Sequence, residues 1–146
     1  MTVRVPIRWL ARRRGVSGLT VAGSQQMEPL DIHSIQERLR AFAREREWDQ
    51  FHSPKNLAMA LAAEAGELLE IFQWLTEIES ADLSAEDRGR VAEELADIQI
   101  YLLRLADLAD VALPEAVEDK IRHNEAKYPV DLSKGNATKY SRREDG

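Results

Sequence analysis

Four acidic residues stand where their types and spacing could do chemistry. Glu64 takes a leucine position in the apolar stripe of a predicted helix, and Glu67 follows three residues later. Glu94 and Asp97 have the same spacing in a later helix, on a row shared with Tyr101. Residues three apart project from one face of a helix. Two antiparallel helices packed through these faces would therefore bring four carboxylates together.

The chemistry of such a cluster has two interpretations. Four carboxylates cannot all stay ionised in a half-buried groove, so either some are protonated or a divalent cation lies among them. Oxygen ligands alone suit Mg²⁺, Mn²⁺ or Ca²⁺, and Mg²⁺ is commonly completed by substrate phosphates. The alternative is a solvated helix face without a metal. A di-iron centre needs Glu-x-x-His, and no glutamate stands three residues before His33, His52 or His123.

The composition limits the classes of protein that remain. The 146 residues correspond to one domain, and 44% hydrophobic with 32% charged residues excludes disorder of the whole chain. No cysteine is present, which excludes disulfides and thiolate chemistry and fits a cytoplasmic location. The net charge of −6 disfavours binding to nucleic-acid polymers. No apolar run is long enough to span a bilayer, so no membrane partner is expected.

The elements that must position the acids are all helical by their periodicity. Apolar residues recur at three- and four-residue steps over 31–48, 54–76, 84–109 and 113–128, with a polar connection at 76–82. Asp31, Ser53 and Ser84 are expected N-caps. The expected buried stripe of the third helix consists of Val91, Leu95, Ile98, Leu102, Leu105 and Ala109. We predict an all-α protein, an antiparallel four-helix bundle.

The domain organisation follows from charge and composition. Residues 28–130 form the predicted helical domain, and residues 131–146 form a polar C-terminal tail. Residues 1–27 carry five arginines and no acid, and we predict a basic, disordered extension there. Two other interpretations of this segment stay open. It resembles an organelle-targeting leader in composition, and translation starting at Met27 would remove it.

The acids and their neighbours resemble a known family. Glu64-x-x-Glu67 followed by Glu94-x-x-Asp97 is similar to the E-x-x-E…E-x-x-D signature of the MazG-like superfamily, the all-α nucleoside triphosphate pyrophosphohydrolases. Similarity extends over about residues 30–141 and is greatest to members that act on deoxycytidine triphosphate. It includes EWDQFH at 47–52, PKNL at 54–57, GEL at 66–68, FQW at 72–74, EELAD at 93–97, IYL at 100–102, Asn124, YPV at 128–130, and the tail residues Lys134, Gly135, Lys139 and Tyr140.

The resemblance implies a reaction and a set of site residues. It implies hydrolysis of a triphosphate between the α and β phosphates, with Mg²⁺ held by Glu64, Glu67, Glu94 and Asp97. Glu64 or Glu67 is then the expected catalytic base. The substrate-binding residues that it implies, or that are placed to reach a phosphate, are Trp48, Phe51, His52, Trp74, Tyr101, Lys120 and Asn124. The family also assembles as dimers or tetramers, so a homodimer or homotetramer is expected.

One position departs from the family pattern and leaves the substrate open. Mammalian relatives have a histidine on the first helix where this chain has Leu39, so a polar contact to the base or sugar is missing. We therefore expect Mg²⁺-dependent hydrolysis of dCTP or modified dCTP to the monophosphate and pyrophosphate. A broad-range hydrolase, or one acting on dUTP or damaged nucleotides, is the alternative within the same chemistry. A non-catalytic helical interaction module is the alternative outside it.

Overall fold

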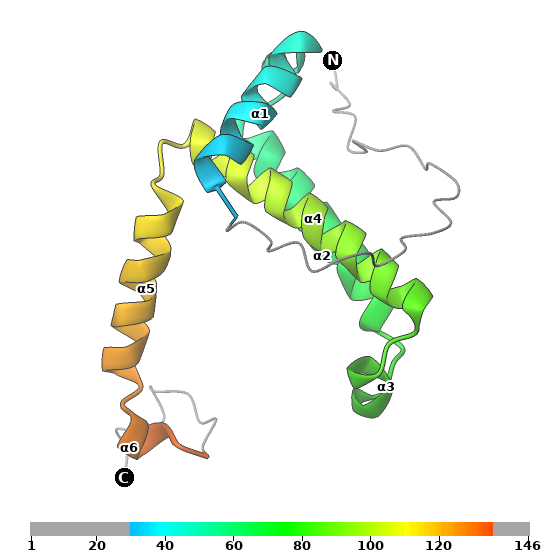
Figure 1. Ribbon diagram of the computed structural model, residues 1–146, viewed down its shortest axis with the longest axis vertical. Helices are drawn as coiled ribbons and strands as arrows, with labels where there is room; N and C mark the ends of the chain where they lie inside the picture. The colour runs from blue at the N-terminus through cyan, green and yellow to red at the C-terminus, as the bar shows by residue number, and fades with distance from the viewer. Residues whose placement is uncertain (1–29, 136–146) are drawn as a thin grey trace, which may run out of the picture. The chain divides into compact units, whose positions relative to one another are not determined.

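Every regular element in residues 30–135, the part of the chain that the computed structural model describes, is helical (Figure 1). This confirms the all-α class for those residues. Within the described residues, 30–109 form one compact unit and 110–135 form a second. The elements are α1 (Ile32–Glu45), the 3-10 helix η1 (Trp48–Gln50), α2 (Pro54–Phe72), α3 (Glu77–Ala81), α4 (Ala85–Leu108), α5 (Leu113–Lys127) and α6 (Val130–Ser133).

Local side-chain caps decide where the long helices begin. The side chains of Asp31, Ser53 and Ser84 accept hydrogen bonds from backbone N–H groups in the first turns of α1, α2 and α4. Each bond satisfies a donor that has no partner within its helix. Pro54 follows Ser53 at a position where its missing N–H costs nothing. The three predicted N-caps are thus confirmed.

Three predicted boundaries were wrong, and one of them is the end of the second helix, which lies at Phe72 rather than at residue 76. The first helix ends at Glu45, before residue 48, because Glu47 takes a left-handed backbone conformation with φ of 54°. The connection predicted at 76–82 contains the short helix α3. Thr76 and Glu79 form a reciprocal capping box there, since each side chain accepts the backbone N–H of the other residue.

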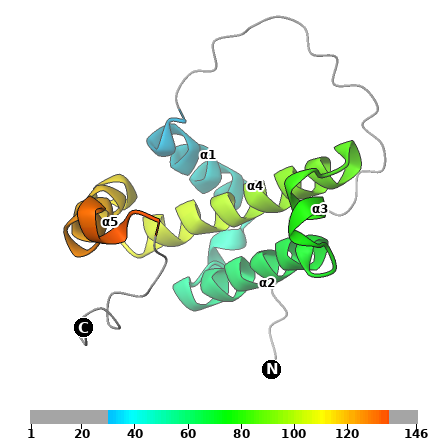
Figure 2. The ribbon, with the colours of Figure 1, turned by 90° about the horizontal axis from the view of Figure 1, so that it is seen from below.

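The first unit is built on the antiparallel pair α2 and α4, with α1 packed against α4 (Figures 1 and 2). Its core cluster joins Leu57 and Ala60 of α2 to Tyr101 of α4, and Leu61 and Leu105 pack against it. A buried aliphatic side chain of this kind contributes about 1.5–3 kcal/mol relative to exposure. The core therefore lies along one face of each helix of the pair.

The expected inner stripe of α4 was wrong in part. Leu95 is 51% exposed, whereas Tyr101 and Leu103 are 4% and 0% exposed. Because α4 packs against both α1 and α2, it buries residues on two faces rather than one apolar stripe. Gln36 on the α1 side donates to the Leu103 carbonyl. The row that contains the acids therefore lies on the side of α4 that carries the core residue Tyr101.

The second unit contains α5 and α6, and α5 begins at Leu113 as predicted. Its expected apolar residues Val117 and Ile121 are 47% and 45% exposed. The part of the chain predicted as the polar tail starts within α6, while residues 1–29 and 136–146 lie outside the described residues, so disorder of 1–27 stays a prediction. Among the described helices, none combines the length and apolar character that crossing a membrane requires.

Candidate metal centre and nucleotide site

Three of the predicted metal ligands converge from two helices. Carboxylate oxygens of Glu64 on α2 and of Glu94 and Asp97 on α4 all lie within 4.8 Å of one another. Glu64 is 6% exposed, and the two α4 acids are half-buried. The i, i+3 spacing of the α4 pair turns both carboxylates to one face, and the leucine-like position of Glu64 directs it inward. The packing of α2 on α4 thus assembles the cluster.

The fourth predicted ligand, Glu67, stands beside this group. It lies three residues after Glu64 on α2 and is half-buried. Its negative charge raises the pKa of Glu64, Glu94 and Asp97, so it acts on all three carboxylates. It does not place an oxygen within the three-acid group itself.

Burial and mutual repulsion disfavour the ionised form of the carboxyl groups in this cluster. Burial, followed by the charges of Asp97, Glu67 and Glu94, raises the pKa of Glu64 to about 7. A hydrogen bond between Glu64 and Glu94 raises the pKa of Glu64 and opposes the rise at Glu94. The shared proton therefore belongs to Glu64. Burial, helped by neighbouring acids, also raises the pKa of Asp97.

The donor set fits a hard divalent cation. All the converging ligand atoms are carboxylate oxygens, which Mg²⁺, Mn²⁺ and Ca²⁺ prefer over softer metals. A cation in their midst would replace the shared proton and cancel the repulsion that raises the three pKa values. Within residues 30–135 this is the one group of three acids or histidines close enough to hold a metal.

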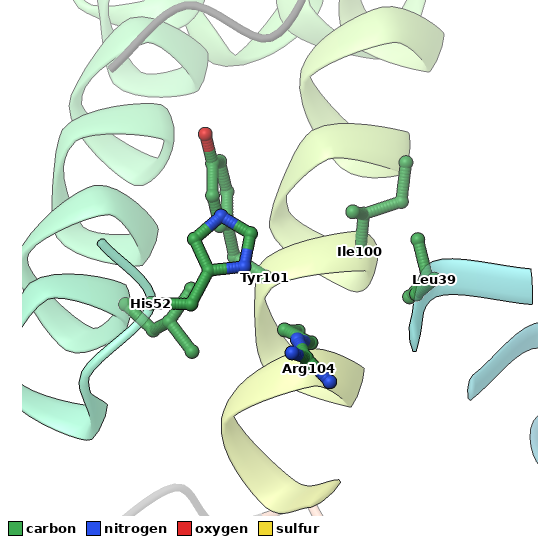
Figure 3. Close-up of a pocket in the computed structure, with 6 residues that line it drawn as sticks. Leu39, His52, Ile100, Tyr101 and Arg104 are labelled. Atoms are coloured by element: carbon green, nitrogen blue, oxygen red, sulfur yellow. The ribbon is translucent and has the colours of Figure 1, made fainter. Parts of the chain in front are cut away.

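Tyr101 connects the acids to a neighbouring pocket. It follows Asp97 by one turn of α4 and is 4% exposed. In Figure 3 its hydroxyl points along α4 away from Arg104. Burial, followed by the charges of Glu64 and Asp97, raises the pKa of Tyr101 above its usual range. The phenol therefore stays protonated and is a hydrogen-bond donor beside the carboxylates.

The pocket combines an apolar wall with three polar side chains. Its lining residues are Leu39, His52, Leu57, Ile100, Tyr101 and Arg104 (Figure 3). His52 is 7% exposed, and burial together with the charge of Arg104 lowers the pKa of its imidazole. The ring is therefore neutral at pH 7, which leaves it one N–H donor and one acceptor nitrogen.

Of the two predicted aromatic residues in and directly after η1, Trp48 packs against a residue that lines the pocket. The Trp48 ring packs edge-on against Phe42 and His52, with centroids 5.8 Å and 6.3 Å apart. Phe51 is half-buried, and its carbonyl accepts a hydrogen bond from the Asn56 side chain, but its side chain does not line the pocket. The structure thus brings His52 and Tyr101 together in the pocket, with Trp48 against His52.

Three predicted substrate contacts are not brought to this pocket by the described structure. Trp74 lies beyond the end of α2 and is 86% exposed. Lys120 and Asn124 are exposed on α5 in the second unit, where their four-residue spacing puts them on one face. Their roles stay predictions.

The sequence interpretation missed Arg104. A lone arginine in an amphipathic helix reads as part of the solvated face, yet Arg104 is 6% exposed. The signal that was available is its spacing. Arg104 continues the inner row of Glu94, Asp97 and Tyr101 at the next three-residue step.

Two helices that present facing carboxylates beside a pocket lined by His52 and Tyr101 are typical of metal-dependent enzymes acting on phosphates. A model of the MazG-like family matches residues 59–142, and the chain belongs to that family. Over 107 residues the chain is 48% identical to dCTP pyrophosphatase 1 of Mus musculus and 46% identical to that of Homo sapiens. These alignments cover 71% of this chain and 63% of each relative, so the chain spans just under two thirds of their length.

A solved structure shows the same fold. The crystal structure of a pyrophosphatase from Archaeoglobus fulgidus superposes with a TM-score of 0.64 at 43% sequence identity. The alignment covers 67% of this chain and 92% of that one. The resemblance stated from the sequence motifs is therefore confirmed.

Proposed function

We propose that this protein hydrolyses a nucleoside triphosphate, foremost dCTP or a modified dCTP, to the monophosphate and pyrophosphate with Mg²⁺ as cofactor. The observation that carries the proposal is the convergence of Glu64, Glu94 and Asp97 beside the pocket of His52 and Tyr101. The relatives named dCTP pyrophosphatase 1 support the substrate. The family match supports the reaction class.

The acids of the cluster have two proposed roles, which are binding of Mg²⁺ and transfer of a proton from water. Glu64, Glu67, Glu94 and Asp97 would hold Mg²⁺, which supplies positive charge to the triphosphate and polarises its α-phosphoryl group when bound. Glu64 or Glu67 accepts a proton from the attacking water as its oxygen bonds to the α phosphorus. The bond from that phosphorus to the bridging oxygen breaks, and pyrophosphate leaves with the electron pair.

The other residues orient the nucleotide. The Trp48 indole offers a face on which a pyrimidine stacks. His52, as a neutral imidazole, and Tyr101, as a protonated phenol, offer hydrogen bonds to the base or sugar. Phe51 and Trp74 complete the proposed nucleoside contacts. Lys120 and Asn124 are proposed to bind the pyrophosphate oxygens, where positive charge and N–H donors stabilise the leaving group.

A broader substrate range is the second candidate, and the pocket wall is the observation that favours it. Leu39 and Ile100 give part of the wall no hydrogen-bonding capacity. An apolar wall discriminates weakly between rings that differ in a polar edge. Hydrolysis of dUTP or of damaged nucleotides would use the same acids. Only the relative rates of hydrolysis of the different nucleotides distinguish it from dCTP hydrolysis.

The exposed apolar side chains support self-association. Leu69, Leu95 and Ile78 are 63%, 51% and 84% exposed within one chain. Large exposed apolar side chains mark contact surfaces when they gather. We propose a cytoplasmic homodimer or homotetramer, with no nucleic-acid polymer or membrane as partner. Light scattering that shows a fully active monomer would contradict the oligomer.

Product analysis tests the proposed reaction. Purified protein with Mg²⁺ is incubated separately with dCTP, dUTP and the other triphosphates in water enriched in ¹⁸O. We expect dCMP and pyrophosphate, with the label in dCMP because water attacks the α phosphorus. Glu94→Gln should abolish turnover, whereas Glu70→Gln, an exposed α2 control, should leave it unchanged. Absence of any monophosphate would favour the non-catalytic interaction module instead.

A further inference from the structure

Arg104, a buried side chain of α4, forms an ion pair with Asp49 in the segment that carries Trp48 and His52. We propose that Arg104 is a positioning residue, which holds η1 and the following turn at the nucleotide site by its ion pair with Asp49. The inference rests on the proposed function, because it gives the segment a role in substrate binding. Arg104 would act through the loop and make no contact with the reacting atoms.

The contacts of Arg104 reach from α4 to η1. One terminal nitrogen of its guanidinium donates to Asp49 Oδ1 at 2.5 Å, and the other donates to Asp107 Oδ2 at 3.0 Å. Asp49 is the middle residue of η1, directly after Trp48. The Arg104 side chain is 7% exposed and that of Asp49 is 54% exposed, so the pair joins a buried guanidinium to a carboxylate that solvent reaches.

Asp107 fixes the direction in which Arg104 points. Arg40 of α1 donates hydrogen bonds to the Asp107 carboxylate. Its Nε lies 3.0 Å from both oxygens, and a terminal nitrogen lies 2.8 Å from Oδ1. The hydrogen bond from Arg40 lowers the pKa of Asp107, so its charge persists well into acid. Arg104 thus donates to Asp107, whose position Arg40 fixes, and also to Asp49.

The backbone of the segment is held by local hydrogen bonds. Phe51 N–H and His52 N–H donate to the Trp48 carbonyl, and the Gln50 side chain donates to the Glu47 carbonyl. The Arg104–Asp49 pair adds a link between the segment and the helix that bears Asp97 and Tyr101. Arg104 also lines the pocket with His52 (Figure 3). This Arg104–Asp49 pair is the proposed tether. It fixes the distance between η1 and α4, the two elements that carry the site residues.

Two single variants and their combination test the tether. Asp49→Asn leaves Arg104 paired with Asp107, and Arg104→Gln leaves Asp107 paired with Arg40, so neither strands a buried charge. Asp49 is 54% exposed, which makes Asp49→Asn the variant that disturbs folding least. Hydrogen exchange of the Phe51 and His52 amides is measured on the free protein. KM and kcat are measured with dCTP and Mg²⁺.

If Arg104 acts through Asp49, both single variants should behave alike. We expect exchange at Phe51 and His52 to rise about tenfold in each, and KM to rise about tenfold with kcat within about twofold. The double variant should show no further change, because both substitutions break one link. Arg104→Lys should recover part of the KM, since it keeps the charge but loses the two-pronged geometry.

Arg90→Gln is the matched control, because it removes an ion pair of α4, that with Asp87, without touching Asp49, Asp107 or Arg104. It should leave KM and the exchange at Phe51 and His52 unchanged. An increase in KM for Arg104→Gln but not for Asp49→Asn would overturn the tether, and so would loosened amides with an unchanged KM. A wild-type protein that hydrolyses no nucleotide contradicts the proposed function instead. Exchange in the free variants then still supports or overturns the tether itself.

Discussion

Glu64 and Glu94 share a hydrogen bond between α2 and α4, and the proton of that bond belongs to Glu64. The bond exists because burial and three neighbouring acids raise the pKa of Glu64 to about 7. One carboxyl proton thus stands where a divalent cation would otherwise supply positive charge. Protons and metal ions should therefore compete for this place.

Without metal, the protein should lose stability as the pH rises through the pKa of Glu64. The folded-state pKa of about 7 exceeds the ordinary 4.5, so the native state binds more protons than the unfolded state between these values. Its free energy of unfolding must then fall across pH 4.5 to 7. Denaturation by urea in the presence of EDTA at pH 5 and pH 8 measures this. Equal free energies of unfolding at pH 5 and pH 8 would contradict the raised pKa of Glu64.

Glu64→Gln should stabilise the metal-free protein at pH 8. The substitution removes a buried negative charge and keeps the volume of the side chain, and we expect a gain of about 1 kcal/mol. The measurement is the free energy of unfolding with EDTA. Glu70→Gln on the exposed face of α2 is the control and should change little. A loss of stability in Glu64→Gln would show that the ionised carboxylate is favourable where it stands.

Mg²⁺ should stabilise the protein and release protons when it binds. At about 100 times its Kd, a ligand specific for the native state adds about 2.7 kcal/mol to the free energy of unfolding. Calorimetry at pH 6.5 in two buffers with different ionisation enthalpies counts the protons released. Glu94→Gln should stay folded by circular dichroism but lose the Tm increase with Mg²⁺. A full increase in that variant would remove Glu94 from the metal site.

Tyr101→Phe should lower turnover while the fold persists. The phenol stays protonated because burial and the nearby acids raise its pKa, so the variant removes one buried donor and no charge. We expect kcat/KM with dCTP to fall about fivefold, the effect of losing a hydrogen bond of about 1 kcal/mol to a neutral base or sugar group. Tm measurements identify any loss of packing. Unchanged kinetics would show that the hydroxyl serves only the core.

Leu57→Ala should be among the most destabilising single truncations in the first unit. Leu57 is 2% exposed and lies in the core cluster with Ala60 and Tyr101, so its removal leaves a cavity that costs about 2–5 kcal/mol. Urea denaturation measures the loss. Leu69→Ala is the control, because Leu69 is 63% exposed on the same helix. Equal effects of the two would place the core elsewhere.

Local signals in the sequence determined most of the helices. The side chains of Asp31, Ser53 and Ser84 cap backbone groups three residues away, so no tertiary contact is needed to specify these starts. The capping box of Thr76 and Glu79 is equally local and could have predicted α3. The spacing of the four acids likewise predicted that they share helix faces.

Tertiary packing alone decided which sector of each helix faces inward. The apolar stripe of α4 suggested that Leu95 is buried, but α4 contacts two other helices, and Tyr101 and Arg104 are buried instead. Sequence periodicity reports which residues share a face of one helix, whereas burial depends on where the neighbouring helices cross it. The buried position of Arg104 and its link to Asp49 follow from that crossing, because the pair joins residues 55 positions apart.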